Sequence, residues 1–507
     1  MSRSIMIVTL GLVLVCFVWI GPVAGRLPPK RPTAASLQAS VANAGNANHG
    51  GGNNRHINLA GAAYTVPLLD FILDPTLAIQ GFNYIQGGFD AQAIGDKYFV
   101  SGSENFYSPF AAPTWSTVNV VDRQGNIVSQ LLCPPRMSTT NVIASRNPDR
   151  PYVVLTRMTP QNASAPLILS SPAKFTILIH HVDWNTGIIS QTPLLEINMK
   201  DLDPYLYDGS AAYNGEAGLS ENGRDLVLTY GAIAIVDNQV ALVQKLAVYE
   251  IALAGTSIAL RSSTVFPSPP APTYLYFTQR ALMRTINDDQ SAVVICANSY
   301  SVAGDIDPFG VTGSLITLID SKSAGTLVIN SLVPYNQYCN GFDVNPSLTR
   351  IAIVDNLAGA PEGLLTRGAY TNGAPAPLDS FRVYSYSPLA AANATSLVFS
   401  QNTHQHGQSV RYSNDGKMLA LTQAPSLAVT IIPDPTEAGL LSLVYPPCTV
   451  QVLRATGDQY DDVITKLPAP APVLALALAW SNDDKQLIVG GMASPVQADI
   501  VVYNVTQ

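Results

Sequence analysis

Short apolar runs separated by turn-forming residues recur along the chain. In residues 409–422, SVRYSNDGKMLALT, one apolar run enters the turn Asn414-Asp415-Gly416 and a second run leaves it. Asn and Asp hydrogen-bond their own backbone in such turns and Gly adopts positive φ, so this stretch predicts a β-hairpin. A similar unit occurs at residues 474–490, LALALAWSNDDKQLIVG. Self-similarity of this kind indicates a repeat architecture.

The hairpin unit is found at seven places, and an apolar run follows each turn. The turns contain Gly95, Asn147, Asn222, Asn287, Asn345, Asn414 and Asn482. Continuous apolar runs bounded by turn residues are typical of strands that are buried on both faces. These runs therefore predict strands in the interior of the fold.

An alternating strand follows each hairpin, and after six of them comes another short strand. The alternating strands are expected at residues 117–122, 175–183, 245–250, 315–320, 381–386, 449–453 and 499–503. Examples of the final strand are residues 188–195 and 326–332. Each unit thus has four strands, except the seventh, which ends after its third strand near Gln507.

An apolar strand at residues 64–72, YTVPLLDFI, precedes the first unit and has no hairpin of its own. Pairing it with the last unit closes the ring and removes exposed sheet edges. We therefore expect an all-β fold, a seven-bladed β-propeller of four-stranded antiparallel blades, closed by an N-terminal strand that completes the last blade. Six or eight blades are the alternatives.

Two segments resemble WD-repeat propellers. Val182-Asp183-Trp184-Asn185-Thr186-Gly187 is similar to their strand and turn, and residues 412–416 are similar to their inner hairpin. The repeats here are longer than the ~40–45 residues of WD repeats, and the Trp-Asp pair that closes each WD repeat is missing. Secreted propellers of the lactonase or quinoprotein-like kind are equally compatible. The resemblance implies the propeller superfamily and no specific family.

The N-terminus is typical of a targeting segment. Arg3 precedes an apolar run at residues 5–20, and small residues follow at Val23-Ala24-Gly25. This pattern predicts a signal peptide over residues 1–25, or an uncleaved signal anchor that would hold the protein on a membrane. Residues 26–56 are polar and rich in Gly and Asn, so we expect a disordered linker. Residues 57–507 then form one propeller domain that is secreted or extracytoplasmic.

Charge and cysteine usage refine this picture. The formal net charge is −8 and only 12% of residues are charged, so nucleic acid is an improbable partner. Outside the targeting segment the cysteines are Cys133, Cys296, Cys339 and Cys448. An even number permits disulfides in an oxidising compartment. A Cys296–Cys339 bridge is our hypothesis; the alternative is that Cys296 is simply buried.

Propeller topology places the second-to-third-strand connections and the blade-to-blade connections on one face, here called the loop face. The expected long loops are residues 102–114, 159–173, 298–313, 356–379 and 423–447. Long loops on a rigid scaffold often carry binding surface. The candidate binding aromatics in them are Phe106, Tyr107, Phe110, Tyr300, Phe309 and Tyr370. The alternative is that these rings only pack their own loops onto the blade rim.

Candidate metal ligands are few. His404 and His406 precede the sixth inner strand near the channel mouth and are candidate binding residues. They can point the same way and ligate a metal, but no third ligand is evident, and the alternative is a hydrogen-bonded position on the rim. Asp305 and Asp307 form one acidic cluster, and Asp201, Asp203 and Asp208 form another. Carboxylates of this kind suit Ca²⁺, and they are also ordinary turn chemistry.

No phosphate-binding loop, nucleophile elbow or zinc-protease helix occurs. The sequence therefore favours a binding or scaffold module that engages a protein or glycan partner through the loop face. The first alternative is a hydrolase or lactonase-like enzyme with a metal at the channel mouth. The second is a structural component of a particle or envelope. The oligomeric state is not predicted.

Overall fold

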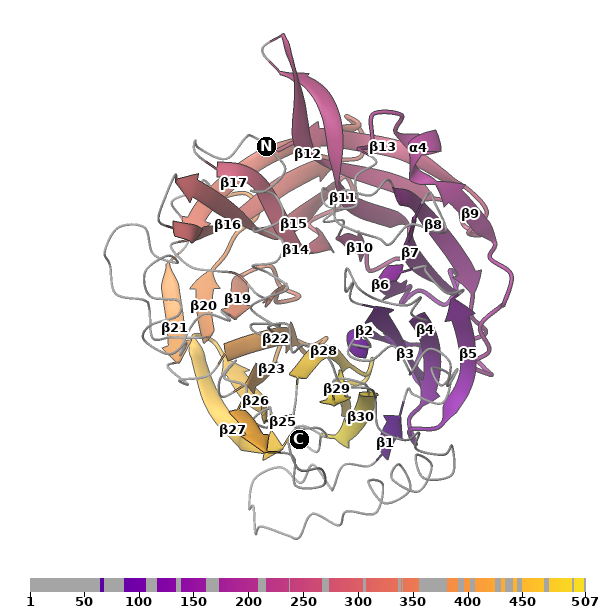
Figure 1. The fold of residues 1–507 in the computed structure, drawn as a ribbon, viewed down its shortest axis with the longest axis vertical. Coiled ribbons are helices and arrows are strands. Elements are labelled where there is room, and N and C mark those ends of the chain that lie inside the picture. Colours follow the sequence, from indigo (N-terminus) through magenta and orange to yellow (C-terminus); the bar gives the residue numbers. More distant parts are fainter. Residues whose placement is uncertain are drawn as a thin grey trace.

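The computed structural model describes thirty strands, of which all but two form blades around a central axis (Figure 1). The residues that it describes are 64–67, 86–105, 116–133, 138–160, 173–207, 216–236, 238–266, 273–303, 307–335, 339, 341–354, 381–390, 396–401, 406–424, 430–433, 441–444, 449–468, 474–494 and 497–505. These residues form seven four-stranded antiparallel sheets and one two-stranded sheet. The seven-bladed propeller predicted from the repeats is confirmed.

The first three blades follow one another in sequence order. Blade 1 contains β2 (Gln86–Ile94), β3 (Tyr98–Asn105), β4 (Ser116–Asp122) and β5 (Ile127–Cys133). Blade 2 contains β6 (Ser138–Ala144), β7 (Tyr152–Pro160), β8 (Ala173–His181) and β9 (Leu195–Asn198). Blade 3 contains β10 (Ala217–Leu219), β11 (Asp225–Val236), β12 (Gln239–Ile251) and β13 (Ile258–Val265).

The other four blades complete the ring. Blade 4 contains β14 (Thr273–Thr285), β15 (Gln290–Ala303), β16 (Asp307–Ser321) and β17 (Thr326–Tyr335). Blade 5 contains β18 (Gly341–Val344), β19 (Arg350–Val354), β20 (Phe381–Ser385) and β21 (Leu397–Gln401). Blade 6 contains β22 (His406–Tyr412), β23 (Met418–Ala424), β26 (Thr449–Thr456) and β27 (Gln459–Pro468). Blade 7 contains β28 (Leu474–Trp480), β29 (Gln486–Ser494), β30 (Gln497–Asn504) and β1 (Tyr64–Pro67).

The buried hydrophobic residues that the structure describes form seven clusters, and each cluster fills one junction between neighbouring blades. Strand β11 illustrates how one strand serves two junctions. Leu226 and Leu228 pack toward blade 2, whereas Val227 packs toward blade 4. A strand buried on both faces needs apolar residues at consecutive positions. This arrangement explains the continuous apolar runs after each predicted turn.

Blade 7 also meets blade 1 through such a cluster. Ala93, Phe99 and Val121 of blade 1 pack with Ile488 and Val502 of blade 7. The ring is therefore continuous through side-chain packing between its first and last blades.

Strand β1 lies antiparallel to β30, with Tyr64 opposite Val502 and Pro67 opposite Asp499. This is the partner that the sequence predicts for the N-terminal strand, although the predicted strand extended to residue 72 and residues 68–72 lie outside the described part. That this strand is what holds the ring closed remains a prediction. Residues 1–56, including the predicted targeting segment and linker, are also outside the described part.

Two predicted loops contain strands instead. Within residues 298–313, strands β15 and β16 continue as a ladder that pairs Tyr300 with Val311 and Ala303 with Asp307. Within residues 423–447, β24 (Thr430–Pro433) pairs with β25 (Leu441–Val444). Both segments contain alternating or β-branched residues, and such segments form hairpins readily once their ends are held by a blade.

The fourth strand of blade 2 starts later than predicted. β9 begins at Leu195, and the preceding residues contribute only an isolated bridge between Val182 and Ile189. Gly187 has a φ of 73°, and Pro193 has no N–H to donate. Pro193 within the predicted range 188–195 and Gly187 just before it therefore disfavour a regular ladder there.

A buried ionic group joins blades 3 and 4. Arg261 of β13 donates to Asp225 of β11 and to Asp320 of β16. The two carboxylate side chains are 1% and 0% exposed, and Ser262 Oγ donates to Asp320 Oδ1 at 2.7 Å. Burial raises the pKa of Asp225 even though Arg261 opposes the shift. One guanidinium thus neutralises part of the charge of two desolvated carboxylates.

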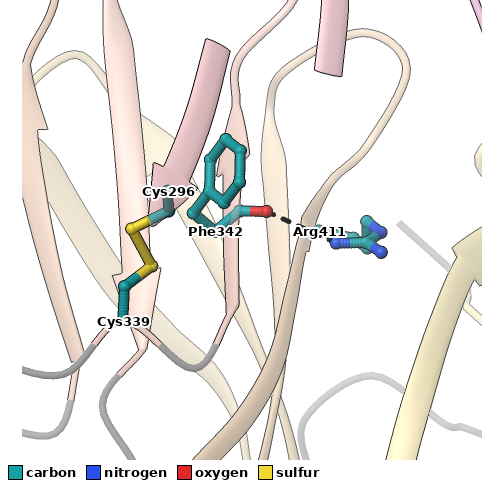
Figure 2. The surroundings of a disulfide bond; sticks show 4 residues. All are labelled: Cys296, Cys339, Phe342 and Arg411. Atoms are coloured by element: carbon teal, nitrogen blue, oxygen red, sulfur yellow. Dashed lines mark hydrogen bonds between the residues drawn. A yellow bond between two sulfur atoms is a disulfide. The ribbon is translucent and has the colours of Figure 1, made fainter. Parts of the chain in front are cut away.

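A disulfide joins Cys296 and Cys339, with 6.3 Å between their Cα atoms (Figure 2). Cys296 lies in β15 of blade 4 and Cys339 lies just before β18 of blade 5, and both are buried. The structure therefore contains the bridge that the sequence analysis hypothesised. Nearby, Phe342 O accepts a hydrogen bond from Arg411 of blade 6 at 3.4 Å.

Candidate functional site

The most prominent described feature of the loop face is the hairpin formed by β11 and β12. It extends beyond the outline of the ring at the top of Figure 1. The two strands pair without a bulge from Asp225 opposite Glu250 to Val236 opposite Gln239. β10 covers β11 only as far as Leu228, and β13 covers β12 only as far as Lys245. The distal part of the hairpin therefore leaves the blade.

Asn238 lies in the turn at the tip, between the paired residues Val236 and Gln239. Asn238 has a φ of 62°, a conformation that Asn tolerates better than most residues and that two-residue hairpin turns favour. The repeat pattern did not predict this hairpin, because its alternating strands continue directly from the strands of the blade. The Asp-Asn pair between two β-rich runs was the available signal.

The segment that links blades 2 and 3 holds the base of the hairpin. Helix α4 (Met199–Leu202) ends at Asp203, whose N–H donates to Met199 O. Beyond it, Ile233 N donates to Tyr205 O at 2.8 Å and Tyr207 N donates to Gly231 O at 3.1 Å. Residues 205–207 therefore act as a short added strand along the edge of β11 that faces away from β12, beyond the end of β10.

Asp203 fixes the start of this segment. Its carboxylate accepts hydrogen bonds from Lys245 Nζ at 2.7 Å, from Tyr230 Oη at 2.9 Å and from Tyr205 N at 3.0 Å. Burial alone would raise the pKa of Asp203, but these hydrogen bonds outweigh it and the pKa is lowered. The carboxylate thus stays ionised and holds Tyr205 in place.

The braced hairpin exposes apolar side chains on one face. Leu206 and Ala232 form a bridge and are buried. Their neighbours Tyr205 and Ile233 point the other way, because successive side chains alternate across a sheet. The exposed fractions are 66% for Tyr205, 77% for Ile235 and 78% for Val240.

We call this set the hairpin patch: Tyr205, Tyr207, Ile233, Ile235 and Val240. Ile235 lies opposite Val240 in the register, so the two side chains are on the same face. Backbone hydrogen bonds hold the part of the patch at Tyr205, Tyr207 and Ile233 in one geometry. Exposed aromatic and aliphatic groups that are held in this way are suited to protein recognition, because less conformational entropy is lost on binding.

The predicted binding aromatics fall on different parts of the chain. Tyr300 lies in β15 and Phe309 lies in β16, so both belong to the extended hairpin of blade 4. Phe106, Tyr107, Phe110 and Tyr370 lie outside the described residues. The structure therefore does not bring these six aromatics together within its described part.

The predicted metal ligands are also distributed. His406 is the first residue of β22 and Asp307 is the first residue of β16, whereas His404 and Asp305 lie outside the described residues. Among the residues that are described, no three His, Cys, Asp or Glu side chains form a group that could hold a metal ion. Asp203, from the second acidic cluster, has Lys245 as its partner, which supports the turn interpretation of that cluster.

The described residues contain no helix that is both long and apolar enough to span a membrane. Neither protein-family models nor curated protein sequences give a match to this chain.

Solved propeller structures resemble the chain. One, from the mitotic checkpoint complex, has 10% identity and a TM-score of 0.42, covering 88% of this chain and 94% of that chain. The periplasmic gluconolactonase of Pseudomonas aeruginosa has 10% identity and a TM-score of 0.42, covering 81% of this chain and 96% of its own. The C-terminal WD40 domain of Sif2 has 10% identity and a TM-score of 0.34, covering 84% and 100%. The chain is thus similar to propellers of both the WD40 and the lactonase kind.

Proposed function

We propose that the protein is an extracytoplasmic binding or scaffold module that holds a protein partner on the loop face of its propeller. The observation that carries this proposal is the hairpin patch. Its exposed Tyr205 and Ile233 are joined by a backbone hydrogen bond and fixed by the buried Asp203. Aromatic and aliphatic groups held in a fixed geometry are typical anchors of protein interfaces.

Two features support the extracytoplasmic setting. The apolar run at residues 5–20 with small residues after it is typical of a secretory signal. The buried Cys296–Cys339 disulfide is stable in an oxidising compartment and rare in a reducing one. Asp203 and Lys245, at the base of the hairpin, form an ion pair with each other, which fits a supporting role for both in a binding surface.

Affinity capture from the extracytoplasmic fraction of the source cells tests the proposal. The protein is immobilised, and bound proteins are identified by mass spectrometry for the wild type and for a Tyr205→Ser/Ile233→Ser variant. We expect the variant to lose the captured partner, because it removes two anchors without touching the buried Leu206.

The matched control is Leu253→Ser/Ile188→Ser. Both residues are exposed, at 61% and 56%, and both lie in third-to-fourth-strand connections on the face opposite the loop face. The control should capture the partner as the wild type does. Equal capture by all three proteins would refute the hairpin patch as the binding surface.

A further inference from the structure

The distal edge of β12 has no strand beside it in the described part of the chain. Strand β13 reaches only Lys245, and Phe266 N donates to Gln244 O at 2.8 Å beyond it. The sequence then continues with Pro267, Pro269, Pro270 and Pro272, which have no N–H groups to donate. Among the residues that the structure describes, none therefore pairs with the outer edge of residues 239–243.

The hairpin register determines which backbone groups face outward. In a two-residue hairpin the residues flanking the turn, Val236 and Gln239, form a hydrogen-bonded pair, and every second residue after them does the same. The backbone N–H and C=O groups of Val240 and Leu242 then face away from β11. The Phe266 bond to Gln244 O fits this alternation, since Gln244 is next in the outward series.

This edge lacks the features that normally prevent pairing between chains. The residues Gln239-Val240-Ala241-Leu242-Val243 include no charge, no Pro and no Gly, and the β11–β12 ladder has no bulge. Exposed edges in soluble monomers usually carry one of these devices. An apolar edge without any of these features indicates that another strand pairs with it.

We infer that a second copy of this chain pairs with the edge, so that two β12 strands join antiparallel about a two-fold axis at Ala241. In this register Val240 of one copy lies opposite Leu242 of the other. The backbone N–H and C=O groups of both residues face the partner copy. Two hydrogen-bonded pairs form across the junction, and the two hairpins become one four-stranded sheet.

Self-complementarity and charge favour a second copy as the occupant. The edge is neutral, whereas the chain has a net charge of −8, so two copies can approach here with less repulsion than across most other surfaces. The contact extends the hairpin patch across the axis, because Ile235 and Val240 of both copies then lie on the same side of the joined sheet. The interface is small, so we expect a dimer that dissociates in roughly the micromolar range.

Sedimentation velocity of the full-length protein over a dilution series tests the inference. The wild type should shift from dimer to monomer as it is diluted. Val240→Lys places a charge on the edge and should raise the dissociation constant about tenfold or more. Val328→Lys is the matched control, since Val328 is 58% exposed on β17, and it should behave as the wild type does.

Crosslinking tests the register directly. At the two-fold axis, Ala241 faces its own counterpart in a non-hydrogen-bonded pair, where Cα atoms are ~4.5 Å apart and within the range of a disulfide. Ala241→Cys should give an oxidised dimer that is reversed by reductant. Ala234→Cys, on the far strand of the hairpin, should not.

A wild type that stays monomeric at all concentrations overturns the inference, as does a dimer that neither Val240→Lys nor Ala241→Cys affects. The inference goes beyond the proposed function, and the two fail separately: capture depends on Tyr205 and Ile233, whereas self-association is measured without any other protein.

Discussion

Arg123 and Asp483 form a bidentate ion pair, with two hydrogen bonds, although they are 360 residues apart in the sequence. Arg123 Nη1 and Nη2 each lie 3.0 Å from one carboxylate oxygen of Asp483. Arg123 follows the third strand of blade 1, and Asp483 is in the inner-hairpin turn of blade 7. The pair therefore spans the junction where the last blade meets the first. Asn482 Nδ2 adds a bond to Gly95 O at 2.8 Å across the same junction.

Neutralising this pair should lower stability modestly. Arg123→Gln and Asp483→Asn are each expected to reduce the free energy of unfolding by about 1 kcal/mol or less, because both side chains keep contact with water. A double-mutant cycle measured by denaturant unfolding should show a coupling between them. A coupling indistinguishable from zero would mean that packing alone holds the junction.

The same pair predicts a pH dependence. Burial would raise the pKa of Asp483, but hydrogen bonds from Arg123 and Ser481 outweigh it and lower the pKa to about 2. Because the pKa in the unfolded chain is ~3.9, the stabilisation is fully present above about pH 4 and is lost as the pH falls toward 2. Asp483→Asn should therefore make stability less sensitive to pH in this window, and an unchanged pH profile would contradict the assignment.

Closure by the N-terminal strand can be tested by crosslinking. Val66 lies opposite Ile500 in the β1–β30 register, and cross-strand Cα distances of ~4.5–5.5 Å suit a disulfide. Val66→Cys with Ile500→Cys should oxidise to an intramolecular bridge that peptide mapping detects. Val66→Cys with Val489→Cys, on the neighbouring strand β29, serves as the control and should remain reduced. Absence of the first bridge would show that β1 does not latch blade 7.

Removing the guanidinium of Arg261 should be strongly destabilising. Arg261→Leu leaves Asp225 and Asp320 buried without their cation, which typically costs about 3–5 kcal/mol. Arg224→Leu is the matched control, because its ion pair with Glu250 has both side chains more than 40% exposed, and it should cost less than about 1 kcal/mol. Equal losses in the two variants, measured by denaturant unfolding, would mean that the buried carboxylates find other partners.

The Cys296–Cys339 bridge should stabilise the protein by constraining the unfolded chain. The cysteines are 43 residues apart, for which the chain-entropy model gives about 4 kcal/mol. Cys296→Ala/Cys339→Ala should lower the unfolding midpoint in guanidinium. Wild-type protein that is unfolded and refolded in dithiothreitol should have its unfolding midpoint lowered to a similar value. The same treatment should not change the midpoint of the variant. A variant as stable as the wild type would show that the bridge contributes little.

The repeat was predictable because its signals are local. In the turn of blade 6, Ser413 Oγ accepts from Met418 N at 2.9 Å and donates to Asp415 Oδ1 at 2.8 Å. Such bonds form between residues a few positions apart, so the same residue types recur wherever the turn recurs. Burial of a strand on both faces likewise leaves a direct trace, a continuous apolar run.

The contacts between blades, in contrast, have no recognisable pattern in the sequence. Asp484 accepts hydrogen bonds from the N–H groups of Asn414 and Asp415 in the neighbouring turn, at 2.8 and 2.9 Å. In the sequence, Asp484 is indistinguishable from any other turn aspartate. Only the ring geometry makes it a link between blades 6 and 7.

The sequence by itself thus determined the number of blades, their four strands and the turns between them, because hairpin chemistry and two-faced burial depend on neighbouring residues. Only the tertiary structure decided that β11 and β12 continue past their blade and present Tyr205, Ile235 and Val240 to solvent. An alternating segment has the same pattern whether or not another strand lies beside it. What fixes its exposure is where β10 and β13 end, and that depends on how the whole ring packs.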